Sequence, residues 1–201
     1  DRKNIKRNYI AGARIRCYTA SRAFVQFVLC IIQSAILTLS YVGVAIVYGN
    51  ELPETGILTN YPMVEFYISI FLLMYAADAM GIMISCLVKK EEAANVLAPY
   101  ILIVQLIFSG ILFAMEGMAD YISYVMISRW GMEALGSIAN LNDLPLKIQM
   151  TVPTVPHEFE SRFDSTPEHL LTVWAVLFGF IVVFLLVGNI LLHRVSKDTK
   201  G

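Results

Sequence analysis

The chain has 201 residues, of which 57% are hydrophobic and 15% are charged, with a formal net charge of −1 and a mean hydropathy of +0.65. This balance excludes an ordinary soluble globular domain and predicts an all-α membrane protein. The near-zero net charge gives no support to nucleic-acid binding. Cys17, Cys30 and Cys86 lack the CxxC spacing of metal and redox sites, so no metal site is predicted.

The chain begins with a basic segment, residues 1–22, which holds seven of the 15 Lys and Arg residues. It is interrupted by Gly12, and several of its residues fall roughly on one helical face. Such a segment can contact anionic lipid headgroups or dock on a protein partner, and periodicity alone favours the lipid. Both interpretations remain open on these residues.

Four apolar stretches are long enough to cross a bilayer, which needs roughly 20 residues per helix. The predicted membrane spans are 24–47, 66–88, 96–115 and 170–192. Lys and Arg are concentrated before the first span, between the second and third, and after the fourth. The connections 48–62 and 116–168 are acidic by comparison. The positive-inside rule therefore predicts cytoplasmic termini and places segment 116–168 outside.

The outer segment, residues 116–168, has two parts. Residues 121–140 mix apolar and polar side chains at helical spacing, which predicts short helices at the outer membrane face. Arg129 and Glu133 are four apart and can form an ion pair on one helix. Trp130 is suited to an interfacial anchor. An irregular loop is predicted for the second part, because it contains Pro145, Pro153, Pro156 and Pro167.

Catalytic motifs are absent from this sequence. It has no GxxxxGK[ST], HExxH or GxSxG pattern, so no P-loop nucleotide site, metalloprotease site or nucleophile elbow is predicted. His157, His169 and His193 are isolated along the chain and are predicted to be solvated. We therefore expect neither enzymatic activity nor a cofactor in this chain.

Asp78 is the one ionisable residue within the apolar stretch 75–85. At 1.5 Å per residue it lies about 15 Å from the cytoplasmic end of its span. Intramembrane carboxylates usually face protein or a water-filled cavity and have a partner. Gln33 and Gln105 are predicted at nearly the same depth, so the three side chains form a mid-membrane layer. A role in helix packing and a role in a substrate or ion path both remain open for these residues. A layer of one acid and two amides favours the packing role.

The helix that carries Asp78 has two different faces. Small and polar side chains share the Asp78 face, which is predicted to face protein. The opposite face is predicted to meet lipid, because it is uniformly apolar: Ile70, Leu73, Ala77, Met80, Ile84 and Leu87. Glu65 lies at the outer end of this helix, where water can reach it, and a structural role is predicted for it.

Three stretches carry patterns of a known family. "DRKNIKRNYIAGARIRCYTASR" follows E-R-x₄-R-E-R-x-x-G-x₅-Y-x-x-S-[KR], with Asn8 in place of the usual acid. The second stretch is "MGIMISCLVKKEEAANVLAPYILIVQLIFSGILF", which includes Gln105 and Ser109, and the third is "YVMISRWGMEALGS". Together they resemble the type-2 ATP-binding-cassette exporter permeases of the white/pleiotropic-drug-resistance branch, in particular the bacterial members.

This resemblance implies that the chain supplies helices three to six of a six-helix permease. Gln33, Asp78, Gln105 and Ser109 then belong to the substrate path or to helix packing. A small residue is more usual in the family at the position of Asp78. The basic segment becomes a coupling element against an ATPase domain, which would bind ATP and Mg²⁺. The residues expected to carry this coupling are Arg2, Lys6, Arg7, Gly12 and Tyr18.

The resemblance also implies a dimer, in which two copies enclose a path across the membrane. Two other functions remain as alternatives. One is a non-transporting membrane anchor or sensor that docks through the basic segment. The other is an ion-coupled secondary transporter that uses Asp78. A path lined by apolar and amide groups favours lipids, drugs or other amphipaths as cargo.

Overall fold

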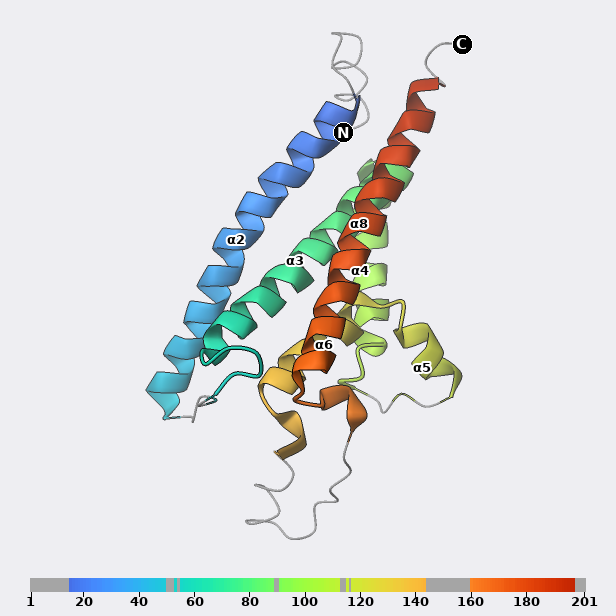
Figure 1. Ribbon diagram of the computed structural model, residues 1–201. Coiled ribbons are helices and arrows are strands. Elements are labelled where there is room, and N and C mark those ends of the chain that lie inside the picture. The colour runs from blue at the N-terminus through green and yellow to red at the C-terminus, as the bar shows by residue number, and fades with distance from the viewer. Residues whose placement is uncertain are drawn as a thin grey trace.

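The computed structural model describes residues 15–49, 53, 55–88, 91–112, 115, 117–143 and 160–197. Over these residues the chain is helical and has no strand, as the all-α prediction requires (Figure 1). The long helices are α2 (Ile15–Tyr48), α3 (Pro62–Leu87), α4 (Glu91–Ile107) and α8 (Pro167–Lys197). The short ones are α5 (Met118–Ser123), α6 (Ile127–Ile138), and the 3-10 turns η1 (Leu141–Asp143) and η2 (Ser161–Phe163).

Three helices are long and apolar enough to cross a membrane: Ala20–Tyr48, Pro62–Leu87 and Pro167–Leu192. The span predicted for residues 96–115 is different, because α4 ends at Ile107. Its apolar part, Ala93–Ile107, is about 22 Å long, short of a hydrocarbon core of about 30 Å. The helix ends where Gly110 adopts φ +83°, a conformation that favours glycine. Over the described residues the structure therefore has three helices of membrane-spanning length and one shorter apolar helix.

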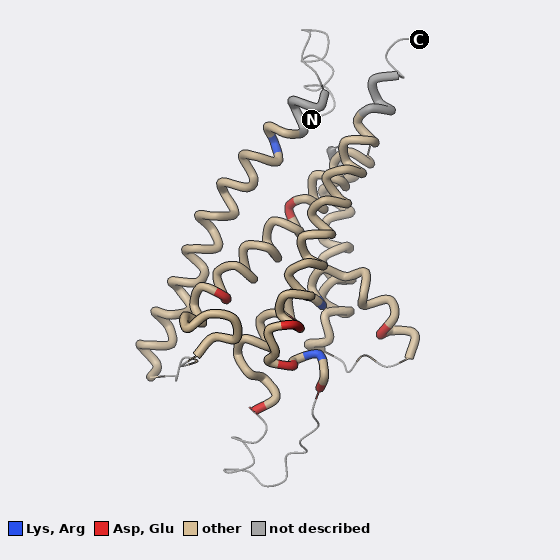
Figure 2. The backbone as a smooth tube through the Cα atoms, in the orientation of Figure 1, with Lys and Arg blue, Asp and Glu red and all other residues tan. Residues whose placement is uncertain are grey.

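The two ends of the bundle differ in composition. The start of α2, the end of α3, the start of α4 and the end of α8 lie at one end, here called the terminal end (Figure 1). The turn before α3 and helices α5 and α6 lie at the opposite end, here called the loop end. Most charged residues drawn for the described chain are at the loop end, while the long helices are almost uncharged (Figure 2). This distribution fits helices surrounded by lipid.

The core lies mainly between α3 and α8. Ala76 and Ala79 of α3 are fully buried, and such small side chains let two helices approach closely. The indole Nε1 of Trp174 donates a hydrogen bond to the Ser69 hydroxyl at 2.8 Å, which joins the same two helices. The opposing α8 side chains recur at helical spacing and are also fully buried: Leu170, Val173 and Leu177.

The face of α3 that was predicted to meet lipid is in part a packing face. Ile70 and Ile84 are buried, so the prediction is wrong for these two residues. Ala77 and Leu87 of this face are exposed, as predicted. The cause of the burial is tertiary, because α3 packs against α8, α2 and α6. Uniform apolarity did not distinguish a lipid-facing surface from a helix-facing one.

Glu65 is fully buried, whereas the sequence predicted contact with water. Its carboxylate accepts hydrogen bonds from the backbone N–H groups of Ile57 at 2.8 Å, Leu58 at 2.7 Å and Thr59 at 2.6 Å. A Cβ on Gly56 would lie 2.4 Å from the Thr59 carbonyl oxygen and 2.6 Å from Glu65 Oε1. The carboxylate therefore organises the turn before α3, and glycine leaves room for it. The structural role predicted for Glu65 is confirmed in this form.

Candidate functional site

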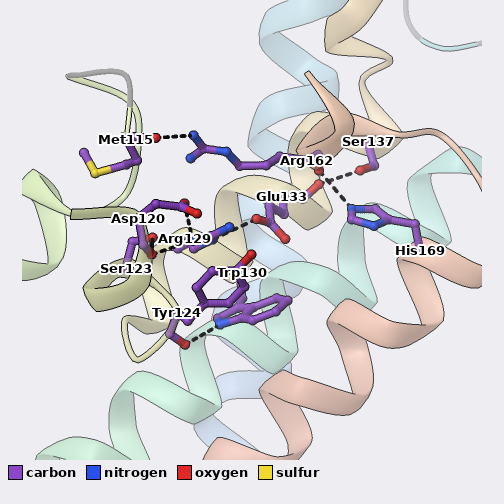
Figure 3. A network of polar contacts seen from close by, with 10 residues as sticks. All are labelled: Met115, Asp120, Ser123, Tyr124, Arg129, Trp130, Glu133, Ser137, Arg162 and His169. Carbon is purple, nitrogen blue, oxygen red and sulfur yellow. Dashed lines mark hydrogen bonds and ion pairs between the residues drawn. The ribbon is translucent and has the colours of Figure 1, made fainter. Parts of the chain in front are cut away.

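A polar centre lies at the loop end, where the chain between α4 and α8 folds back against the bundle (Figure 3). Arg129 of α6 is buried at this centre. Its Nε donates to Glu133 Oε1 at 2.9 Å, which confirms the predicted ion pair. Its Nη1 donates to Asp120 Oδ1 at 2.8 Å and to the Ser123 hydroxyl. One guanidinium group thus fastens α5 to α6.

The electrostatics of this centre keep Arg129 charged. Burial by itself lowers the pKa of the Arg129 guanidinium. The hydrogen bond and charge of Glu133, together with the electrostatic interactions with Asp120 and Tyr124, raise the pKa by more, so the net shift is upward. The guanidinium carbon also lies 3.6 Å from the centroid of the Tyr124 ring, in cation–π geometry. The group is a permanent structural cation rather than a proton donor.

Trp130 packs beside this centre. Its indole Nε1 donates to the Tyr124 backbone carbonyl at 2.9 Å, and its ring packs against the hydrophobic core. The N–H group is therefore satisfied by protein. Its predicted role as a membrane-interface anchor stays a prediction.

Gln105 of α4 holds the start of α6. The N-cap residue of α6, Met126, has no side-chain cap. Gln105 Oε1 accepts a hydrogen bond from the Ser128 backbone N–H at 3.0 Å, and the Ser128 hydroxyl donates to the Gln105 carbonyl. Its Nε2 lies 3.8 Å from Met80 Sδ on α3. Gln105 therefore joins three helices and supplies the cap that α6 lacks.

A second set of contacts fixes η2 to the loop end. Arg162 Nη2 donates to the Met115 carbonyl at 3.5 Å. His169 Nε2 lies 2.9 Å from the Arg162 carbonyl and acts as the donor, since a carbonyl can only accept. His169 was predicted to be solvated, and this prediction is wrong: the side chain is half-buried and bonded.

Asp78 has a partner that the sequence analysis did not identify. The Cys30 thiol of α2 donates to Asp78 Oδ2 at 3.0 Å. Gln33 is exposed, and Gln105 is engaged with α6. Among the described residues, therefore, no hydrogen bond joins the predicted layer of Gln33, Asp78 and Gln105. Helix geometry gives the reason, because Cys30 rather than Gln33 is on the α2 face that meets α3.

Ser109 has a local role at the end of α4. It is buried, its hydroxyl donates to the Leu106 carbonyl at 2.7 Å, and its oxygen accepts the Ile111 N–H at 3.2 Å. These bonds form the turn that ends the helix. The side chain thus has a packing role in this structure and is not placed with Asp78.

The residues predicted for coupling lie almost entirely outside the described residues. These are Arg2, Lys6, Arg7 and Gly12. Tyr18 is within α2, of which only the helical backbone is described at this position. Helix α2 runs without a break from Ile15 to Tyr48, so the end of the basic segment is continuous with the first membrane span.

Sequence reasoning missed four residues of these centres: Cys30, Asp120, Ser123 and Ser128. Asp120 carried a usable signal, because an acid in the segment predicted to form short helices precedes the arginine of the predicted ion pair. Ser123 and Ser128 carried little signal, since serine is common in such short polar helices. Cys30 was set aside because no other cysteine lies at metal-site or redox-site spacing from it, although a buried thiol can also donate a weak hydrogen bond.

Replacing Gln105 by leucine is expected to destabilise the protein by about 1–2 kcal/mol, because the first turn of α6 loses its acceptor. The matched control is Gln33→Leu, which removes an exposed amide of similar predicted depth. Thermal unfolding of the purified protein in detergent would compare the two. Equal midpoints for both variants would contradict the capping role of Gln105.

Two comparisons with known proteins point to the same class, the ABC transporters. Residues 1–139 match the model of the family described as ABC-2 type transporter. The chain is also similar to an ABC transporter ATP-binding/permease protein of Mycobacterium tuberculosis, with 26% identity over 191 residues. That alignment covers 92% of this chain and 20% of the relative, so the chain spans about a fifth of the relative's length. No solved structure matches the chain. The family match includes α2 to α6, and with them Cys30, Asp78, Gln105 and Arg129.

Proposed function

The chain belongs to the ABC-2 type transporter family, and on this basis we propose that it supplies helices three to six of an ATP-driven exporter permease. The match over residues 1–139 is the observation that carries the proposal. Three helices of membrane-spanning length support it. The chain has no P-loop motif, so ATP and Mg²⁺ would be bound by a partner ATPase domain. Two copies of the permease would enclose the path.

Helix α2 is suited to carry motion from the ATPase into the membrane. It is a single helix of 34 residues, about 50 Å long, that starts in the basic segment. Its contacts are with α3 and, to a smaller extent, with α8, and most of its apolar side chains are exposed. Moving it would therefore disturb its contacts with α3 and α8 and leave the contact between α3 and α8 in place. By the positive-inside rule its start, with both chain termini, would be cytoplasmic.

The loop end is suited to remain rigid while α2 moves. Gln105 ties α4 to α6, and Arg129 ties α6 to α5. The core residues Ile127 and Ala134 of α6 pack with α3 and α8. In our proposal this block forms the outer boundary of the path, and α2 changes its position against it.

Ion-coupled transport through Asp78 is the less favoured alternative. Among the described residues Asp78 has the Cys30 thiol as its hydrogen-bond partner and forms no ion pair. A proton relay needs a second titratable group with a pKa suited to the exchange, and a thiol is a weak donor. The anchor or sensor alternative has no observation specific to it. Family membership favours transport over both.

Coupling through the basic segment gives the experiment that tests this function. A cysteine at Lys6 is expected to crosslink to a cysteine on the ATPase surface, because this segment would dock there. ATP with vanadate should change the crosslinking yield, since the coupling segment moves with the ATPase. The matched control is Lys147→Cys, in the segment predicted to lie outside. Deletion of residues 2–14 should abolish ATP-driven transport in proteoliposomes.

The same experiment can contradict the proposal. Crosslinking at Lys147 in place of Lys6 would reverse the proposed orientation. Undiminished ATP-driven transport after the deletion would show that the basic segment is not the coupling element.

A further inference from the structure

Asp78 is an ionisable group in the membrane-spanning part of α3, about 14 Å from the end of that helix. One carboxylate oxygen accepts the Cys30 thiol at 3.0 Å, and a thiol is a weak donor. No ion pair is found for Asp78 among the described residues. A carboxylate at this depth is costly unless a cation, a proton or strong donors compensate it. The hydrogen bond to Cys30 alone is a weak compensation.

Asp78 and Cys30 meet where α3 packs against α2, and we call this contact region the α2–α3 seam. Aromatic rings line it. The Phe27 ring lies 5.3 Å from the Phe71 ring and 5.5 Å from the Tyr75 ring, edge to face in both cases. Phe71 and Tyr75 are stacked with centroids 6.0 Å apart. These two residues precede Asp78 by seven and three positions, so all three share one face of α3. Phe27 precedes Cys30 by three positions on α2.

The position of Tyr75 is fixed by a polar contact. Its hydroxyl donates to the Ala23 carbonyl of α2 at 3.3 Å. Its polar end is thus satisfied by protein, and the ring is left to interact through its face and edges. The aromatic cluster is therefore a built feature of the α2–α3 seam rather than a set of mobile side chains.

The seam is accessible from the side of the protein. Phe27 is 38% exposed, and Asp78, Phe71 and Tyr75 are half-buried, whereas Cys30 is fully buried. Cys30 thus forms the base of the seam, and the aromatic rings and the carboxylate form its accessible part. The exposed part of Phe27 and the half-buried side chains beside it form the side from which a ligand would enter.

The chemistry of this seam selects one ligand class. A carboxylate provides a counter-charge, and aromatic faces attract organic cations through their quadrupoles. A metal ion is disfavoured, because no group of three or more His, Cys, Asp or Glu side chains able to hold one occurs in the described part of the chain. We propose that Asp78, Tyr75, Phe71 and Phe27 form a recognition site for amphipathic organic cations that enter from the membrane.

That these cations are transported cargo rests on the proposed function. That they bind at this site does not, because binding requires no ATP. Binding is therefore measured on the complete transporter that contains this chain, purified in detergent and kept free of nucleotide. The probe is radiolabelled tetraphenylphosphonium, which carries a permanent charge and cannot lose a proton. Tetraphenylborate has nearly the same shape and the opposite charge, so it serves as the competitor that reports charge selectivity.

The wild-type protein is expected to bind tetraphenylphosphonium saturably, with little competition from tetraphenylborate. Asp78→Asn should weaken binding tenfold or more, while elution volume and unfolding midpoint stay near wild type, because the amide oxygen still accepts the Cys30 thiol. Phe71→Leu and Phe27→Leu should each weaken binding about threefold or more, since each removes an aromatic face. Gln33→Leu is the matched control and should bind as wild type does.

Several results would overturn the site. They are absence of saturable binding to the wild-type protein, equal competition by the borate, and unchanged affinity in Asp78→Asn. If Asp78→Asn does not fold, the Phe71→Leu and Phe27→Leu variants test the site instead. Wild-type affinity in both would show that the aromatic cluster does not bind the cation. Normal cation binding without any ATP-driven transport would refute the proposed function and leave the site standing.

Discussion

Replacing Arg129 by methionine is expected to destabilise the protein by about 3–5 kcal/mol, because Glu133 is then a buried charge without its partner. The same change removes the contacts that hold Asp120 and Ser123, so α5 should detach from α6. A lower unfolding midpoint in detergent and faster proteolysis between α4 and α6 would report the two effects. The control is Arg162→Met, which removes a half-buried guanidinium that donates a long hydrogen bond to the Met115 carbonyl in the described part of the chain.

The double variant Arg129→Met/Glu133→Leu separates charge from packing. Removing both partners of a buried ion pair is often nearly neutral, so this variant should regain much of the stability lost in Arg129→Met. If it remains as unstable as the single variant, the loss comes from the bonds to α5 and not from the unpaired carboxylate. Wild-type stability in Arg129→Met itself would contradict the structure of the centre.

Replacing Glu65 by alanine is expected to have the second largest effect. Three backbone N–H groups in the turn before α3 lose their acceptor, and each buried unsatisfied group costs about 1–3 kcal/mol. Some of this cost is offset if water enters the turn, so we expect a total near 3 kcal/mol. Glu65→Gln should lose less, because one oxygen can still accept. Differential scanning fluorimetry of the purified protein would measure the change.

The control for Glu65 is Glu168→Gln, which alters an exposed carboxylate in the first turn of α8. It should leave the unfolding midpoint nearly unchanged. The turn also constrains the companion glycine, since Gly56→Ala would place a methyl group against Thr59 and Glu65. Equal midpoints for Glu65→Ala and Glu168→Gln would show that the turn needs no internal acceptor.

The Arg129 centre and the turn around Glu65 lie in different connections at the loop end and are stabilised in the same way. In each, a buried ionised side chain satisfies polar groups of a turn or short helix that has few contacts of its own. Helix α5 illustrates this: Tyr121 within it and Val125 just after it are exposed, and the hydrogen bonds of Arg129 to Asp120 and Ser123 hold it to α6. Loss of either charge should therefore affect the loop end before the core between α3 and α8.

Local pattern was sufficient where neighbours in sequence are also neighbours in space. The pair Arg129 and Glu133 could be predicted because residues four apart meet on a helix. The long apolar helices could be predicted from hydropathy, since backbone groups in lipid must bond within their own segment. The end of α4 at Ile107 could not, because hydropathy continues past the turn at Ser109 and Gly110.

Partners distant in sequence required the tertiary structure. Depth along each helix placed Gln33, Asp78 and Gln105 at one level, but depth does not specify the direction in which a side chain points. Asp78 contacts Cys30 and Gln105 contacts Ser128 because the rotation of α2 and α4 about their axes is set by packing. The burial of Glu65 has a more local origin, since the turn just before α3 folds back over its carboxylate.

By itself, then, the sequence determined that this protein is a helical membrane protein and which segments carry its charge, because hydropathy and charge act on each segment independently. It also determined the ion pair of Arg129 with Glu133 within α6. Tertiary structure alone decided which polar groups meet: Cys30 with Asp78, Gln105 with the start of α6, and Glu65 with the turn before α3. The first two contacts depend on how helices rotate and pack against one another, and uniformly apolar surfaces leave that choice open. The third depends on how the turn folds over the carboxylate, which helical periodicity does not describe.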